Sequence, residues 1–101
     1  MSSETKPLPE LHQSTLDSET VSTLFRDLEA CAEIFAVIPK VAPGHITPSN
    51  ITLQEGEALL NAGDLRGLQI RYRFNDAEWW DTLICVNNEI RITRIQQDFG
   101  A

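Results

Sequence analysis

The side chains best able to do chemistry in this chain are two histidines and two cysteines. A metal site or a nucleophile–base pair needs such groups to cluster with further ligands or with a carboxylate. Neither His12 nor His45 has a cysteine or carboxylate beside it at metal-ligand spacing, and Cys31 and Cys85 form no CxxC motif. We therefore predict that the protein holds no metal ion and no other cofactor.

Catalysis by paired carboxylates is disfavoured as well. Glu78 and Asp81 are close in sequence, but on a strand their spacing directs them to opposite faces, so they cannot share a proton. The chain contains no G-x-S-x-G, HExxH, P-loop or GxGxxG motif. We predict that the protein is not an enzyme. The alternative is a small enzyme or ligand-binding protein that uses the loop at residues 43–45.

The adjacent Trp79 and Trp80 are the strongest indication of a binding surface. They fall in a predicted strand over residues 78–86, where successive side chains point to opposite faces. One indole therefore enters the core, whereas the other emerges on the far face. A small domain seldom leaves so large an apolar ring uncovered there, so the outward indole predicts a contact surface.

The length of the preceding turn decides which indole faces outward. A three-residue turn over 75–77 sets Tyr72 opposite Trp80, which places Trp80 in the core. A two-residue turn would instead set Asp81 opposite Ile70 and bury a carboxylate without a partner, which is costly. The three-residue turn is therefore favoured.

A three-residue turn over 87–89 is favoured on the same ground, and the meander then has two distinct faces. The inner face, on which both helices are expected to pack, comprises Leu68, Ile70, Tyr72, Trp80, Ile84, Val86, Ile90 and Ile92. The contact residues predicted on the outer face are Trp79, Arg71, Arg73, Arg91, Leu83 and Asp81. Trp and Arg are enriched in interface hot spots, so this face is predicted to bind a protein partner or a second copy of the chain. A structural interpretation stays open, in which Arg73 stacks on Trp79 and the amino-terminal residues cover the rest.

Hydrophobic periodicity predicts two helices and four strands. Apolar residues at helical spacing over 17–31, and capping-box spacing between Thr52 and Glu55 with Gly63 as the C-terminal cap, mark the helices. Residues 33–38 favour a strand, with continuation of the first helix as the alternative. Strands over 68–74, 78–86 and 90–95 form a C-terminal meander. We predict an α+β domain of order α-β-α-β-β-β, with two helices packed on one face of a mainly antiparallel sheet.

The 101 residues are too few for more than one domain. Residues 1–16 combine Pro7 and Pro9 with little apolar periodicity, so we expect a flexible N-terminal tail. The single α+β domain is expected over 17–96, with a frayed C-terminus over 97–101.

Charge and hydropathy exclude several classes of partner. The net charge of −7 repels a polyphosphate backbone, which disfavours nucleic acid, and no apolar run is long enough to span a membrane. Absence of a signal-peptide pattern, together with two distant cysteines, favours a reducing cytoplasm. The leading hypothesis is a non-enzymatic cytoplasmic binding module. An acidic secretion- or assembly-type chaperone is an alternative of similar type.

The strand sequences Gln-Ile-Arg-Tyr-Arg-Phe, Glu-Trp-Trp-Asp-Thr-Leu and Ile-Arg-Ile-Thr-Arg-Ile resemble those of small bacterial proteins. The resemblance implies a bacterial character, and it implies no activity and no functional residue.

Overall fold

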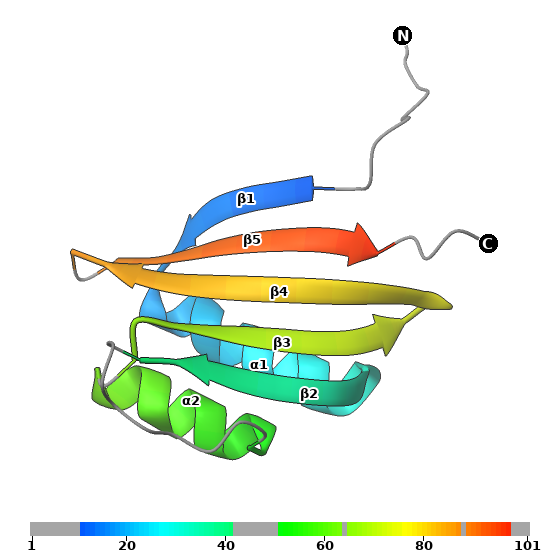
Figure 1. The fold of residues 1–101 in the computed structure, drawn as a ribbon, viewed down its shortest axis with the longest axis horizontal. Helices are drawn as coiled ribbons and strands as arrows, with labels where there is room; N and C mark the ends of the chain where they lie inside the picture. The colour runs from blue at the N-terminus through cyan, green and yellow to red at the C-terminus, as the bar shows by residue number, and fades with distance from the viewer. Residues whose placement is uncertain (1–10, 42–50, 64, 88, 98–101) are drawn as a thin grey trace, which may run out of the picture.

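Two helices pack on one face of a five-stranded antiparallel sheet, whose strand order is β1-β5-β4-β3-β2 (Figure 1). The computed structural model describes residues 11–41, 51–63, 65–87 and 89–97. The elements are β1 Leu11–Leu16, α1 Ser18–Cys31, β2 Glu33–Lys40, α2 Leu53–Ala62, β3 Gly67–Phe74, β4 Ala77–Val86 and β5 Glu89–Gln97. The predicted α+β class and the C-terminal meander are confirmed. No helix among the described residues is long and apolar enough to cross a bilayer.

Both helices begin at the caps that the sequence marks. The Asp17 carboxylate accepts a hydrogen bond from the Thr20 amide at 2.7 Å. Hydrogen bonding to the Thr20 side chain, followed by that to the Thr20 amide, lowers the pKa of Asp17. Thr52 and Glu55 form a reciprocal capping box, and Gly63 ends α2 in the left-handed conformation with φ of 79°. The helices therefore start and stop where local chemistry requires.

The helices cover the sheet through one apolar core. The buried apolar side chains are Val21, Phe25, Leu28, Val37, Leu53, Leu60, Leu65, Leu68, Ile70, Tyr72, Leu83 and Ile92. Gly56 allows α2 to approach closely, because a Cβ there would lie 3.0 Å from Val37 and 3.1 Å from Leu68. The contact fixes α2 over β2 and β3.

The predicted tail is wrong over its last six residues. Leu11–Leu16 form β1, which pairs antiparallel with β5 from Leu11 opposite Ile95 to Leu16 opposite Ile90. The segment is short and mostly polar, so the pairing is supplied by the open backbone edge of β5 and not by apolar periodicity. Residues 1–10 lie outside the described part of the chain. At the other end Gln97 is still in β5, opposite Glu78, so the sheet extends beyond the predicted boundary.

The register of β4 differs from the prediction by one residue. Asn75 and Asp76 alone form the first turn, with φ of 53° and 63°, as a two-residue hairpin with two left-handed positions requires. Tyr72 therefore pairs with Trp79 and not with Trp80. On the other side of β4, Val86 pairs with Glu89, one residue earlier than expected.

A one-residue shift reverses every side chain of β4. Trp79, Asp81, Leu83 and Cys85 lie on the face covered by the helices, whereas Trp80, Ile84 and Val86 lie on the other face. The predicted inner positions of β3 and β5 are correct, since Leu68, Ile70, Tyr72, Ile90 and Ile92 all belong to the helix-covered face.

Candidate functional site

The structure separates the six predicted contact residues into two sets of three. Arg71 and Arg73 of β3 and Arg91 of β5 lie on the uncovered face of the sheet, as predicted. Trp79, Leu83 and Asp81 of β4 lie under the helices, so their assignment to the contact surface is wrong.

Asp81 shows why the rejected register is the correct one. Its carboxylate is fully buried, and it accepts hydrogen bonds from Arg94 Nε at 2.9 Å and Nη2 at 2.7 Å. The Tyr72 hydroxyl also donates to this carboxylate, with its oxygen 3.1 Å from each carboxylate oxygen. The two-residue turns bring Arg94 directly opposite Asp81, so the expected unpaired charge is in fact a bidentate ion pair.

Burial and this ion pair shift the neighbouring groups. Desolvation, followed by the negative charge of Asp81, raises the pKa of Tyr72 well above its usual range. Hydrogen bonding to Asp81 raises the pKa of Arg94. At neutral pH Tyr72 is therefore a neutral donor and Arg94 a fixed cation, which holds the three groups in one arrangement.

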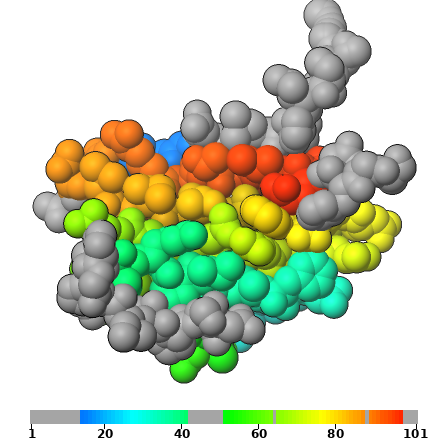
Figure 2. Space-filling view, viewed as in Figure 1, coloured from blue at the N-terminus to red at the C-terminus, as the bar shows by residue number. Residues whose placement is uncertain are grey.

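The uncovered surface, which we call the open face, consists of the outward side chains of β2 to β5. Figure 2 shows it towards the viewer, with β2 to β5 running across it. Its members are Glu33, Phe35, Ala36, Ile38, Lys40, Gln69, Arg71, Arg73, Glu78, Trp80, Thr82, Ile84, Val86, Glu89, Arg91, Thr93, Ile95 and Gln97. Among the described residues no second layer packs on this side of the sheet.

Trp80 occupies the position on the open face that the sequence assigned to Trp79. The Arg71 guanidinium lies over its ring at 4.0 Å from the centroid, which is cation–π distance. Arg71 Nε donates to Gln69 Oε1 at 2.9 Å, and Gln69 Nε2 donates to Thr82 Oγ1 at 3.2 Å. Trp80 Nε1 donates to Glu78 Oε2 at 2.9 Å, so the ring and the guanidinium are both held in place before any partner arrives.

Apolar and cationic side chains surround this stacked pair. Ile84 and Val86 are each 39% exposed and Phe35 is 42% exposed, which is high for large apolar side chains. The guanidinium of Arg73 lies 5.9 Å from the Phe35 ring centroid, at the outer limit of a cation–π contact. The open face therefore offers an apolar centre beside Arg71, a cation that is held in place by its stacking and its hydrogen bond.

The remaining candidates give no second chemical site. Cys85 lies on the helix-covered face, and burial raises the pKa of its thiol, which opposes a reactive role. Cys31 is exposed at the end of α1. His12 lies in β1, whereas His45 and the 43–45 loop fall outside the described residues. Within the described ranges no group of His, Cys, Asp and Glu is placed to hold a metal ion.

Sequence reasoning missed Trp80, Ile84 and Val86 as members of the open face. The signal that identifies them is the Asn75-Asp76 pair, because two residues that tolerate positive φ mark a two-residue hairpin. Comparison of the chain with protein-family models, with curated proteins and with solved structures found no match.

Proposed function

We propose that the protein is a non-enzymatic binding module that docks one other protein on its open face. The observation that carries this proposal is the stacked Arg71–Trp80 pair at the middle of a sheet face without a covering layer. Trp and Arg concentrate binding energy when a partner excludes water from them. Exposed Ile84 and Val86 supply apolar area beside the pair.

The charge of the open face favours a particular partner. The chain as a whole carries a net charge of −7, whereas the open face presents Arg71 and Arg73 beside Glu78, and Arg91 in a 3.7 Å pair with Glu89. Planar guanidinium groups suit bidentate contact with carboxylates. The partner is therefore a protein with an apolar patch bordered by Asp or Glu side chains. A second copy of this chain fits less well, since it brings the same arginines and the same negative net charge.

A reducing compartment is consistent with this role. Cys31 and Cys85 are both free thiols, and we place the protein in the cytoplasm on that basis together with its composition.

Site-directed photocrosslinking in cells tests the proposal. A photoreactive residue at Thr82, beside the Arg71–Trp80 pair, is compared with one at Arg26, which is exposed on α1 on the opposite side. We expect one defined heterologous adduct from position 82, lost on Trp80→Ala and weakened by salt, and no such adduct from position 26.

Two outcomes overturn the proposal. An adduct that survives both Trp80→Ala and Arg71→Ala, or the absence of an adduct from position 82, removes the open face as a docking site. An adduct between two copies, confirmed by sedimentation as a dimer, replaces the heterologous partner with self-association. Circular dichroism of the Trp80→Ala protein checks that the fold is retained.

A further inference from the structure

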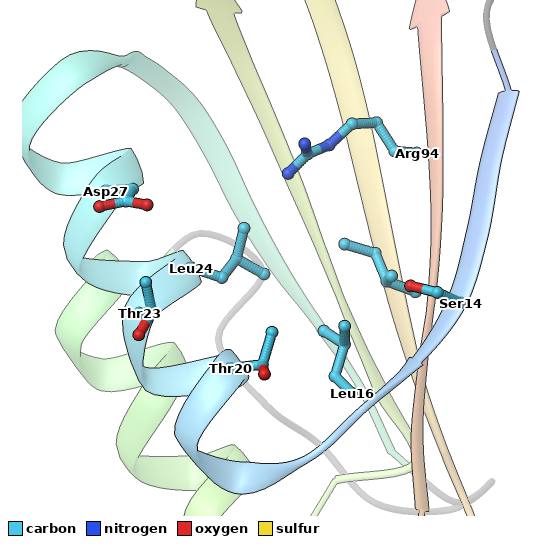
Figure 3. A pocket seen from close by; sticks show the side chains of 8 residues that line it. Ser14, Leu16, Thr20, Thr23, Leu24, Asp27 and Arg94 are labelled. Carbon is cyan, nitrogen blue, oxygen red and sulfur yellow. The ribbon is translucent and has the colours of Figure 1, made fainter.

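A cleft of about 280 Å³ lies on the helix-covered side of the sheet, between α1 and the β1–β5 edge. It is therefore on the opposite side from the open face, and an inference about it does not depend on the proposed docking function. In Figure 3, α1 and β1 diverge from the corner that joins them, and the cleft occupies the space between them. Its volume is near the lower end for ligand sites, which limits any occupant to a small metabolite.

The packing of α1 explains why this space is not filled. The buried stripe of α1, formed by Val21, Phe25 and Leu28, faces the core that the helix shares with α2 and β2. Leu24 is the apolar side chain of α1 that lines the space towards Leu16 of β1, and both are partly buried (Figure 3). Together with Ile92 they give the cleft an apolar floor.

Arg94 enters this cleft as an oriented donor. Asp81 holds it through Nε and Nη2, and its side chain remains 34% exposed, with the guanidinium directed towards α1 (Figure 3). The ion pair fixes the plane of the guanidinium, so Nη1 is available at a defined place without further loss of side-chain entropy on binding.

Asp27 of α1 lines the same end of the cleft (Figure 3). Among the described residues, the ion pairs are Arg94 with Asp81 and Arg91 with Glu89, so no described cation pairs with the Asp27 carboxylate. The hydroxyl groups of Thr20 and Thr23 add neutral donors and acceptors along the helix wall.

The balance of charge selects the class of ligand. One guanidinium with two carboxylates, Asp81 behind it and Asp27 opposite, leaves the site with an excess negative charge. A simple carboxylate is therefore opposed by the local charge, and a simple amine leaves the Arg94 donor unused. A zwitterion satisfies both Arg94 and Asp27 without adding net charge.

We propose that this cleft binds a free α-amino acid with an aliphatic side chain. The carboxylate accepts hydrogen bonds from Arg94 Nη1, the ammonium group donates to Asp27, and the side chain lies on Leu24 and Ile92. No residue of the cleft is placed to transform such a ligand, so the site serves for binding alone.

Amide shifts of the labelled protein on titration with L-leucine, up to about 10 mM, test this site. We expect saturable shifts along α1, β1 and β5, and at least about tenfold weaker binding for N-acetyl-leucine and for leucinamide, each of which lacks one of the two charges. Asp27→Asn should weaken leucine binding by about tenfold, whereas Glu19→Gln on the same helix should leave it unchanged. Leu is a good helix former and is larger than Thr, so Thr23→Leu should preserve α1, fill the cleft and abolish binding.

Three results would overturn the assignment: no saturable shift with L-leucine, equal binding of leucinamide and leucine, or shifts confined to the open face. Each leaves the docking proposal untouched, because photocrosslinking from Thr82 reports on the other side of the sheet. As a control for folding, the amide shifts of residues outside the cleft should be the same in the Asp27→Asn and Thr23→Leu proteins as in the parent.

Discussion

The two sides of β4 both depart from the usual distribution of side chains in a half-covered sheet. Its helix-covered side carries a charged residue, Asp81, between Trp79 and Leu83, whereas its uncovered side carries Trp80, Ile84 and Val86. The covered side tolerates the charge because Arg94 and Tyr72 complete its hydrogen bonds. The apolar side chains on the uncovered side have no covering layer within the molecule, and such exposure indicates a binding partner.

Breaking the buried ion pair should give the largest effect. Arg94→Met leaves the Asp81 carboxylate buried with Tyr72 alone, and we expect a loss of about 3 kcal/mol in the free energy of unfolding, the lower end for such pairs because Arg94 is partly exposed. Urea denaturation measures it. Arg91→Met, which breaks only an exposed 3.7 Å pair with Glu89, should cost less than about 1 kcal/mol.

The double variant Asp81→Leu with Arg94→Met distinguishes the cost of an unpaired buried carboxylate from the cost of lost packing by the Arg94 side chain. Replacing both partners by apolar side chains should restore stability to within about 1 kcal/mol of the parent. If the double variant is as unstable as Arg94→Met alone, the loss comes from packing and not from the unpaired carboxylate.

The next effect compares the two indoles. Trp79 is packed against the core, and Trp79→Ala should cost about 2 kcal/mol, less than a fully buried Trp because the ring is only partly buried. Trp80→Ala removes a surface stack with Arg71 and should cost about 1 kcal/mol or less. Thermal or urea unfolding of both variants checks the order, and a larger loss for Trp80 would mean that the open face is covered.

Trp79 carries one further distinction from Trp80. Its Nε1 is buried and has no hydrogen-bond partner among the described residues, whereas Nε1 of Trp80 donates to Glu78. Trp79→Phe keeps most of the apolar ring and deletes the unsatisfied donor, so it should be much better tolerated than Trp79→Ala.

Most of the fold could be predicted from local sequence signals. The capping residues Asp17 and Thr52, the apolar stripe of α1 and the strand periodicity of β3 and β5 each act within a few neighbours, so the sequence alone reveals them. The strand β1 has no such local signal, since its pairing depends on an edge of β5 that exists only after the sheet has formed.

The candidate site was predicted as a face but with the wrong residues of β4. The wrong register follows from the assumption that a buried Asp81 would have no partner. Arg94, thirteen residues further along the chain, forms the ion pair that offsets the desolvation of this carboxylate. Periodicity cannot distinguish the two faces of β4, because both contain apolar side chains in alternation. The two-residue turn at Asn75 and Asp76 fixes the register, because both residues adopt the positive φ that such a hairpin requires.

A smaller effect on the free energy of unfolding is expected from Tyr72, the neutral donor to the buried Asp81 carboxylate, and this effect depends on pH. Tyr72→Phe removes one hydrogen bond to a carboxylate that keeps Arg94, and should cost about 1 kcal/mol at neutral pH. The pKa of Tyr72 is raised in the folded protein, so the unfolded chain releases the proton first, and parent stability should fall as pH rises above about 10. Urea unfolding against pH should show less of this fall in Tyr72→Phe. Since Tyr72 is the only tyrosine in the chain, the absorbance of its phenolate reports the same titration directly.

The smallest effect on stability is expected from Ile84→Thr. Thr is a good strand residue and Ile84 is 39% exposed on the open face, so the free energy of unfolding should change by no more than about 0.5 kcal/mol. Leu83→Thr, one residue earlier on the same strand, places a hydroxyl in the core at a fully buried position and should cost more than about 2 kcal/mol. Parallel urea titrations of the two variants compare the faces directly. Equal losses would show that Ile84 is covered within the chain, in which case its apolar side chain would no longer argue for a partner.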